Sequence, residues 1–205
     1  MRKTISLFQR NYDGDHLVRN EVVPGAEWVL AGEGVATRKY DGMCCAIIGG
    51  KFFKRLEIQA GKIPPPGWAQ ADSVDTTTGK QQGWILVGEG PEDRWFREAL
   101  ARGKCVTYPF VAGCNSRVDR EWPTFDATYE LLGPKVQGNP EGFDEHVLLL
   151  HEGAQALDAP RDFDGLRAWF DGKDIEGVVW HHPDGRMVKI KTKDFGLRRT
   201  RAVVA

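Results

Sequence analysis

The chain has 205 residues, enough for one large domain or two small ones with a substantial core. Its 28 basic and 29 acidic residues give a net charge of −1, so contact with nucleic acid would need a local basic surface. The longest aliphatic run, Val147-Leu148-Leu149-Leu150, is too short to cross a bilayer, and the apolar stretch behind Met1-Arg2-Lys3 stops at Phe8. We therefore expect no membrane span and no signal peptide, and a cytoplasmic location.

The first half of the chain is strand-rich. Residues 43–48 and 51–58 are joined by Gly49-Gly50, which predicts a β-hairpin. Residues 61–83 carry several proline, glycine and threonine residues and predict a loop or excursion. Pro91 near the start and Gly103 past the end predict a helix over residues 91–101.

The second half follows the same pattern. Strands are predicted over residues 105–110, 126–132 and 146–150, and a short helix over 164–171, ended by Gly172. A closing hairpin pairs 177–181 with 186–191 through Pro183-Asp184-Gly185. These elements predict one compact α+β domain over residues 1–205, dominated by antiparallel strands with a few helices.

The spacing of the cysteines does not predict a structural zinc site. Cys105 and Cys114 are eight residues apart, and no cysteine belongs to a C-x-x-C pair, so reduced and mostly buried thiols are expected. Cys44 and Cys45 are adjacent and should point to opposite faces of a strand.

Two further groups of residues contain side chains that can ligate a metal. His181 and His182 are consecutive in a predicted strand and so face opposite sides, and Asp13-Gly14-Asp15 is typical of a turn. We interpret neither group as a metal site.

Lys39-Tyr40-Asp41-Gly42 directly precedes the apolar residues 43–48. A lysine held against apolar walls and near other cations loses its proton more easily, which makes it a usable nucleophile. A lysine beside an Asp-Gly turn is also common on solvated loops, so the motif needs support from elsewhere in the chain.

The closing hairpin supplies two more lysines. Strand alternation places Lys189 and Lys191 on one face and Val188 and Ile190 on the other. This pattern predicts an apolar face on the core and a charged face lining a cleft. An ordinary amphipathic strand with solvated lysines is the alternative.

Two acidic residues stand in apolar surroundings. Glu130 lies inside the predicted strand 126–132, where a buried carboxylate needs a partner: an arginine in an ion pair, a ligand hydroxyl or a metal-bound water. Glu176 precedes Gly177-Val178-Val179, and alternation groups its side chain with Val178 and Trp180.

These residues follow one another at intervals of 91 residues from Lys39 to Glu130, 46 to Glu176 and 13 to Lys189. The order Lys-x-Asp-Gly, arginine, acid, Glu-Gly-hydrophobic-hydrophobic and Lys-x-Lys resembles the covalent nucleotidyltransferase superfamily of polynucleotide ligases and capping enzymes. A closer resemblance, over residues 35–197, is to the vertebrate-type 5′-3′ RNA ligase 1 family. It is carried by the segments Thr128-Tyr129-Glu130-Leu131-Leu132-Gly133, Gly138-Asn139-Pro140-Glu141-Gly142, Leu166-Arg167-Ala168-Trp169-Phe170 and Ile175-Glu176-Gly177-Val178-Val179-Trp180-His181.

The resemblance implies a nucleotidyltransferase (adenylation) domain of antiparallel sheets, ATP-grasp-like, and an ATP-dependent RNA ligase. Lys39 is implied to attack the α-phosphate of ATP and form a lysyl-adenylate. Arg55 corresponds to the arginine that contacts the ribose or the acceptor phosphate, and Glu130 to an acid near the ribose. Lys189 and Lys191 correspond to the pair that contacts the α-phosphate.

The resemblance also implies a metal. Asp41 would lie beside Lys39 and the water shell of the metal, Glu130 near the metal waters, and Glu176 would support the catalytic metal. Magnesium suits scattered carboxylates because it prefers oxygen ligands and retains waters, with Mn²⁺ as the alternative. The implied partner is RNA with 5′-phosphate and 3′-hydroxyl ends, and no obligate protein partner is evident.

The sequence departs from the family pattern in two places. The aromatic residue that stacks on adenine in many relatives has no clear counterpart; the aliphatic residues 147–150 or His151 stand there instead. Fourteen residues follow Lys191, so we expect no appended oligonucleotide-binding barrel. A minimal DNA ligase, another polynucleotide nucleotidyltransferase, and a catalytically silent nucleic-acid-binding relative remain the alternatives.

Overall fold

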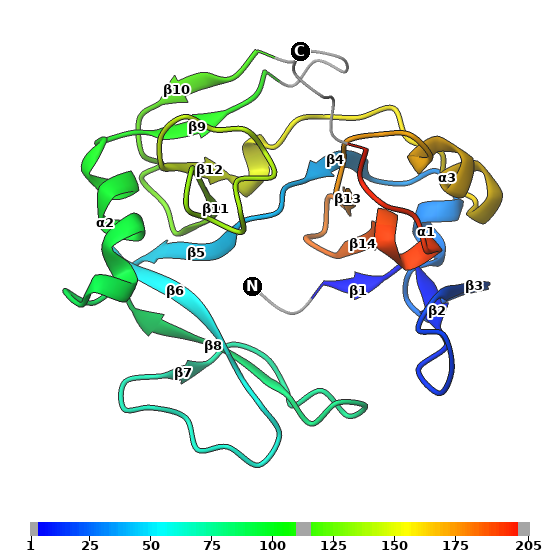
Figure 1. The fold of residues 1–205 in the computed structure, drawn as a ribbon, viewed down its shortest axis with the longest axis horizontal. Coiled ribbons are helices and arrows are strands. Elements are labelled where there is room, and N and C mark those ends of the chain that lie inside the picture. Colours follow the sequence, from blue (N-terminus) through cyan, green and yellow to red (C-terminus); the bar gives the residue numbers. More distant parts are fainter. Residues whose placement is uncertain (1–3, 110–115, 201–205) are drawn as a thin grey trace. The chain divides into compact units, whose positions relative to one another are not determined.

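The computed structural model describes residues 4–109 and 116–200, and it has the predicted α+β character, with mostly sheet and few short helices. None of the helices in these residues is long and apolar enough to cross a membrane. The chain divides into two compact units (Figure 1). The first unit comprises residues 41–107 and 117–153, and the second comprises 4–40 and 154–200 with the described part of 108–116. The single nucleotidyltransferase domain stays a prediction.

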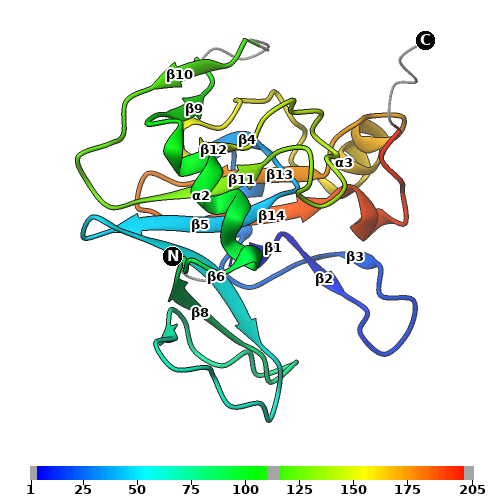
Figure 2. The ribbon, with the colours of Figure 1, turned by 60° about the vertical axis from the view of Figure 1, so that its left-hand side comes forward.

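The first unit is built on an eight-stranded sheet in the order β10-β9-β12-β11-β5-β6-β8-β7 (Figure 2). Its neighbours pair antiparallel except β12 and β9, which pair parallel. The elements in chain order are β5 (Met43–Ile48), β6 (Lys51–Ile58), β7 (Ala69–Gln70), β8 (Gln81–Leu86), the 3₁₀ turn η1 (Pro91–Asp93), α2 (Arg94–Ala101), β9 (Cys105–Thr107), β10 (Val118–Arg120), β11 (Ala127–Leu132), β12 (Val147–Leu150) and the 3₁₀ turn η2 (His151–Gly153).

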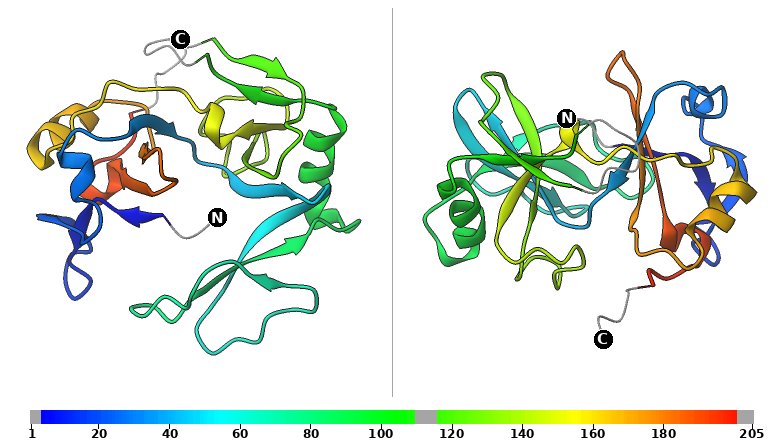
Figure 3. Two further views of the ribbon diagram at one scale, coloured as in Figure 1. Left: turned by 180° about the vertical axis from the view of Figure 1, so that it is seen from behind. Right: turned by 90° about the horizontal axis from the view of Figure 1, so that it is seen from above.

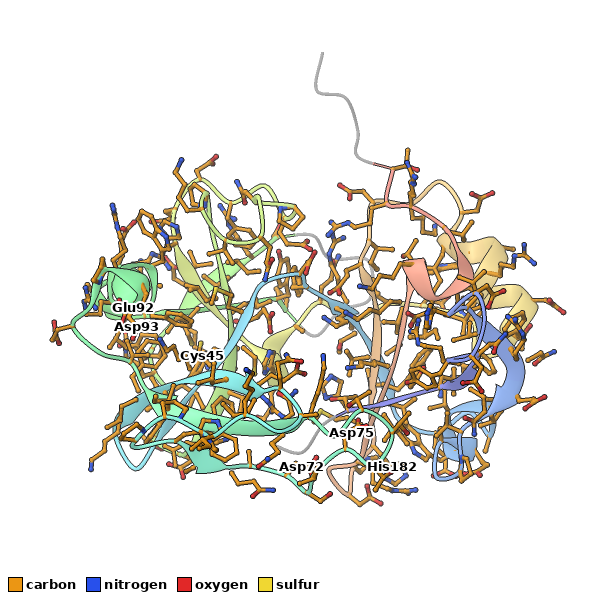
Figure 4. The ribbon with its side chains drawn as sticks, turned by 60° about the horizontal axis from the view of Figure 1, so that its bottom comes forward. Cys45, Asp72, Asp75, Glu92, Asp93 and His182 are labelled. Atoms are coloured by element: carbon orange, nitrogen blue, oxygen red, sulfur yellow. The ribbon has the colours of Figure 1, made fainter. Side chains whose placement is uncertain are left out.

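Strand alternation divides the central strands of this sheet into an apolar and a polar face. On the apolar face, Cys45 of β5, Tyr129 of β11 and Leu148 of β12 pack with Phe96 and Ala99 of α2 in one core. Cys45, labelled in Figure 4, is fully buried there, whereas Cys44 beside it is only partly buried. The prediction that the two thiols face opposite sides is confirmed, since successive strand residues alternate.

The second unit contains a four-stranded sheet in the order β1-β14-β13-β4, in which β1 is parallel to β14 and the other pairs are antiparallel. Its elements are β1 (Ile5–Ser6), β2 (Phe8–Arg10), β3 (Val18–Val22), α1 (Glu27–Leu30), β4 (Val35–Lys39), α3 (Phe163–Phe170), β13 (Gly177–His181), β14 (Met187–Lys191) and the 3₁₀ turn η3 (Thr192–Phe195). The strands β2 and β3 form a separate antiparallel ribbon.

Helix α3 covers the apolar face of this sheet (Figure 3). The Asp162 side chain caps its start by accepting a hydrogen bond of 2.8 Å from the Gly165 N–H. Leu166 and Phe170, one turn apart, are fully buried in the same core as Trp180 of β13. The second core is thus formed by an amphipathic helix on an amphipathic sheet.

Most predicted elements are confirmed. The hairpin of β5 and β6 matches its predicted bounds, and α2, α3, β11, β12 and the closing hairpin lie within a few residues of theirs. The strand predicted over 105–110 ends at Thr107, and Phe110 lies outside the described residues. The short elements β1, β2, β3, α1, β4 and β10 were not predicted, because two to five residues carry too little periodicity.

The prediction of a loop over residues 61–83 is wrong in two places, because residues 69–70 form β7 and the end of the segment joins β8. Residues 81–83 begin β8, which pairs with both β6 and β7. A Cβ added at Gly83 would lie 2.1 Å from the Trp68 ring, so this indole packs directly against the strand backbone. Gly83, which suggested a loop, instead leaves room for an aromatic side chain.

We expect Leu166→Ala to lower the free energy of unfolding by about 2–5 kcal/mol, because it removes a fully buried side chain and leaves a cavity. Leu30→Ala is the matched control, since Leu30 is 45% exposed, and should change stability by less than about 1 kcal/mol. Urea denaturation followed by circular dichroism measures both. Equal losses for the two variants would contradict the packing of α3 against this core.

Candidate active site

Lys39 is the last residue of β4, and its position is set by β13. Gly177, the first residue of β13, pairs with Lys39 on one side and with Lys191 of β14 on the other. Direct cross-strand partners project from the same face of a sheet, so both lysine side chains leave the face of Gly177. A Cβ at Gly177 would lie 2.3 Å from the Ile190 carbonyl oxygen, so the strands approach too closely there for a side chain.

Glu176 joins the two lysines. Its Oε2 lies 2.5 Å from Lys39 Nζ and its Oε1 lies 2.6 Å from Lys191 Nζ. Lys39 Nζ also donates a hydrogen bond of 3.2 Å to the Tyr40 carbonyl. We call Lys39, Glu176 and Lys191 the lysine–glutamate cluster.

Two hydrogen bonds donated by backbone N–H groups hold Glu176 and Lys191 in position. The Thr192 N–H donates to the Glu176 carbonyl at 2.9 Å, and the Lys191 N–H donates to Asp194 Oδ2 at 2.9 Å. The Glu176 side chain is only 10% exposed, so its carboxylate is held in a largely desolvated position.

The Glu176 carboxylate is ionised at neutral pH. Burial alone raises the pKa of Glu176, but the adjacent ammonium groups of Lys39 and Lys191 outweigh burial and bring the pKa below its ordinary value of 4.5. Lys189 projects from the same face as Lys191, and Val188 and Ile190 are fully buried on the other, as predicted. Three lysines and one glutamate on a single face make it a surface for an anion such as phosphate.

The surroundings of Lys39 differ from the prediction in one respect. The expected neighbouring cation is present as Lys191, but the nearest side-chain group is the Glu176 carboxylate, which stabilises the charged ammonium. Strand alternation predicts the Glu176 side chain on the same face as Val178 and Trp180, and this prediction is wrong. Glu176 lies one residue before β13, where alternation does not apply, and its carboxylate reaches the lysines.

Glu130 lies on the polar face of the first unit's sheet. The Gly42 N–H donates to Glu130 Oε1 at 3.1 Å, and Glu130 Oε2 lies 3.0 Å from His151 Nε2. The other ring nitrogen of His151, Nδ1, lies 2.9 Å from Thr128 Oγ1. The predicted need for a polar partner is therefore met by a histidine and a backbone N–H.

Cys44 is the direct cross-strand partner of Glu130. The Sγ atom, a Glu130 oxygen and a His151 ring nitrogen all lie within 4.8 Å of one another. Burial, and after it the Glu130 carboxylate, raises the pKa of the Cys44 thiol to about 12, while Arg55 acts in the opposite direction. We call Cys44, Glu130 and His151 the thiol–imidazole cluster.

Arg55 and Asp41 are held by neighbours within the first unit. Arg55 Nε donates to Gln82 Oε1 at 3.1 Å, and the guanidinium lies 5.3 Å from the centroid of the Trp84 ring. The Asp41 N–H donates to Glu141 Oε1 at 3.1 Å. Sequence reasoning assigned no role to Glu141, because it lies in an irregular segment where no periodicity marks the direction of a side chain.

The histidine pair has separate partners. His182, labelled in Figure 4, lies 2.8 Å from Glu33 Oε2 and 2.7 Å from Asp184 Oδ1. His181 Nε2 instead lies 3.0 Å from Thr37 Oγ1.

The predicted site residues thus form two groups. Lys39, Glu176 and Lys191 meet in the second unit, with Lys189 on the same face. Asp41, Arg55 and Glu130 lie in the first unit, where Glu130 meets Cys44 and His151 instead of another predicted residue. The catalytic and metal-binding roles of all seven residues stay predictions.

Comparison with known proteins finds sequences that this chain resembles. Residues 123–203, which contain Glu130, Glu176, Lys189 and Lys191, match the family model for RNA ligase 1. The expected resemblance to the RNA ligase 1 family is confirmed. RNA ligase 1 of Rattus norvegicus is 24% identical over 219 residues, covering 80% of this chain and 67% of that protein. The Mus musculus protein is 24% identical over 224 residues with the same coverage, and the Danio rerio protein is 35% identical over 83 residues, 36% of this chain and 25% of its own length.

We expect the contribution of Glu176 to stability to depend on pH. Its folded-state pKa is lowered, so the stabilisation is present above the ordinary value of 4.5 and is lost as pH falls through the folded-state pKa. Wild type should melt at a higher temperature than Glu176→Gln at pH 7, and the difference should shrink between pH 5 and pH 3.

Glu89→Gln is the matched control, because the Glu89 side chain is 96% exposed. Its melting temperature should follow that of wild type across the same pH range. A difference between wild type and Glu176→Gln that stays constant from pH 7 to pH 3 would contradict the ion pairs of the lysine–glutamate cluster.

Proposed function

We propose that this protein is an ATP-dependent RNA ligase that joins a 5′-phosphate to a 3′-hydroxyl through a lysyl-adenylate. The observation that carries the proposal is the Glu176 carboxylate between Lys39 Nζ and Lys191 Nζ, at 2.5 and 2.6 Å. It brings the expected nucleophile beside a second cation, on the face that also carries Lys189. The relatives named RNA ligase 1 support the substrate class.

In the proposed first step, the Lys39 ammonium loses one proton to solvent, and the neutral amine attacks the α-phosphorus of ATP and loses a second proton as the phosphoramide forms. An N–P bond forms while the bond to the bridging oxygen of the β-phosphate breaks, and pyrophosphate leaves. Lys191 and Lys189 stabilise the negative charge on the α-phosphate, since phosphoryl transfer depends on placement and charge neutralisation. The resemblance assigns Arg55 to the ribose or the acceptor phosphate, and Glu130 to the ribose.

The adenylate then passes from Lys39 to the RNA 5′-phosphate. Attack by the 3′-hydroxyl on this activated phosphate forms the phosphodiester bond and releases AMP. A nucleotidyltransferase domain that acts in the cytoplasm completes the proposal.

The lysine–glutamate cluster has one group that can bind magnesium, the Glu176 carboxylate, once Lys39 or Lys191 releases one of its oxygens. Glu176 is ionised and offers hard carboxylate oxygens, the ligands that Mg²⁺ prefers, and Mn²⁺ is the alternative. We propose that Glu176 supports the metal, with Asp41 near its water shell and Glu130 near its waters, as the resemblance implies. Magnesium would supply charge neutralisation at the phosphates.

Incubation with ATP labelled at the α-phosphate tests the nucleophile. We expect wild type to retain label after denaturation, and the label to be lost in acid and kept in alkali, as for a phosphoramide. Lys39→Arg keeps the charge and removes the nucleophile, so labelling should disappear. Lys193→Arg is the control, because Lys193 is exposed in η3, and it should label like wild type.

Two results would contradict the lysyl-adenylate. Label that persists in Lys39→Arg would place the nucleophile elsewhere. Absence of label with both ATP and GTP would favour a silent nucleic-acid-binding relative, whose lysines only hold phosphate.

Nicked duplexes test the substrate class. We expect sealing when RNA supplies the 3′-hydroxyl side of the nick and at least a tenfold lower rate when DNA supplies it, because only RNA offers a 2′-hydroxyl for recognition. Equal sealing of both substrates would favour a minimal DNA ligase instead. Gel separation of the joined and unjoined strands measures the two rates.

A further inference from the structure

The thiol–imidazole cluster brings three different metal-ligating groups to one place on the polar face of the first unit's sheet. Cys44 of β5 and Glu130 of β11 are direct cross-strand partners, so their side chains lie side by side. His151 directly follows β12, which pairs with the other edge of β11. One sulfur, one oxygen and one nitrogen atom thereby come within 4.8 Å of one another.

The neighbours of these groups orient the ligand atoms. Thr128 Oγ1, at 2.9 Å, engages His151 Nδ1 and leaves Nε2 facing Glu130. The Gly42 N–H engages Glu130 Oε1 and leaves Oε2 facing His151. For His151 and Glu130, a hydrogen bond on the far side of the ligand atom is the arrangement that holds metal ligands in place in proteins.

We propose that Cys44, Glu130 and His151 bind a divalent zinc ion. A thiolate, an imidazole and a carboxylate form a mixed set that suits Zn²⁺ and does not suit Mg²⁺, which prefers oxygen ligands. Three protein ligands leave one of the four tetrahedral positions of zinc for water or another small ligand. The spacing of the cysteines could not predict this site, because only one of its three ligands is a cysteine.

Zinc binding requires a small change in protonation and contacts. The Cys44 thiol loses its proton to solvent as the zinc–sulfur bond forms. The His151 ring carries its proton on Nδ1, donating to Thr128 Oγ1, so that Nε2 is free to bind the metal beside Glu130. Tetrahedral zinc with bonds of about 2.0–2.3 Å places its ligand atoms roughly 3.3–3.8 Å apart. Glu130 Oε2 and His151 Nε2, now 3.0 Å apart, therefore have to separate slightly to admit the ion. Arg55, which hydrogen-bonds to Cys44, has to release the sulfur.

Zinc at this site would compete with the role proposed above for Glu130, a consequence that rests on the proposed function. A carboxylate that ligates zinc is no longer available to a ribose hydroxyl. We therefore expect zinc to reduce adenylylation of Lys39 in wild type and to have a weaker effect in Cys44→Ala, which lacks one ligand.

Titration of the full chain with Co²⁺ tests the site without any ligase activity, because cobalt replaces zinc and absorbs light. We expect one equivalent to produce a thiolate-to-cobalt charge-transfer band in the near ultraviolet and an intense visible band typical of four-coordinate cobalt. Added Zn²⁺ should abolish both bands, and excess Mg²⁺ should leave them unchanged. Cys44→Ala should lose the charge-transfer band.

Cys45→Ala is the matched control, because Cys45 is the next residue and is buried on the opposite face. It should retain both bands, and circular dichroism checks that each variant is folded.

His151→Ala provides a second variant and should weaken cobalt binding at least tenfold. A wild type without the charge-transfer band, or a band that persists in Cys44→Ala, would overturn the zinc site. Failure of ATP labelling would overturn the proposed function and leave the cobalt result standing.

Discussion

The ion pairs of Glu176 are the interaction on which the second unit's proposed chemistry depends. Glu176 stands 137 residues from Lys39 and 15 from Lys191, and both lysines reach it because β13 lies between β4 and β14. Gly177 is the cross-strand partner of both lysines, and its lack of a side chain lets β14 come close. Without the carboxylate, two ammonium groups would repel each other at one end of a small sheet.

In the first unit, consecutive residues of β5 face opposite sides of the sheet, one side packing in the core and the other carrying the polar cluster. Cys45 packs with Phe96 and Tyr129, and Cys44, one residue earlier, lies beside Glu130 and Arg55. A shift of one residue in the pairing of β5 would exchange the two faces. The register of β5 with β11 therefore maintains both the packing and the polar cluster.

The sequence predicted the elements that carry strong local signals. The Gly49-Gly50 turn and the helix stop at Gly103 marked their elements correctly, and alternation put Lys189 and Lys191 on one face. The partners of Glu130 and Glu176 could not be predicted in the same way. His151 and Lys39 reach these acids only because of the strand order and the register of the sheets. Local sequence periodicity predicts neither the order nor the register.

The reactivity of the Lys39 amine tests the central claim most directly. Brief treatment with acetic anhydride acetylates only uncharged amines, and mass spectrometry of peptides reports each lysine separately. We predict that Lys39 reacts at least tenfold more slowly than the exposed Lys193 in wild type, since the Lys39 amine is ion-paired with Glu176 and its side chain is only 21% exposed. Glu176→Gln should remove most of this protection. Lys39 that reacts as fast as Lys193 in wild type, or equally in both proteins, would contradict the lysine–glutamate cluster.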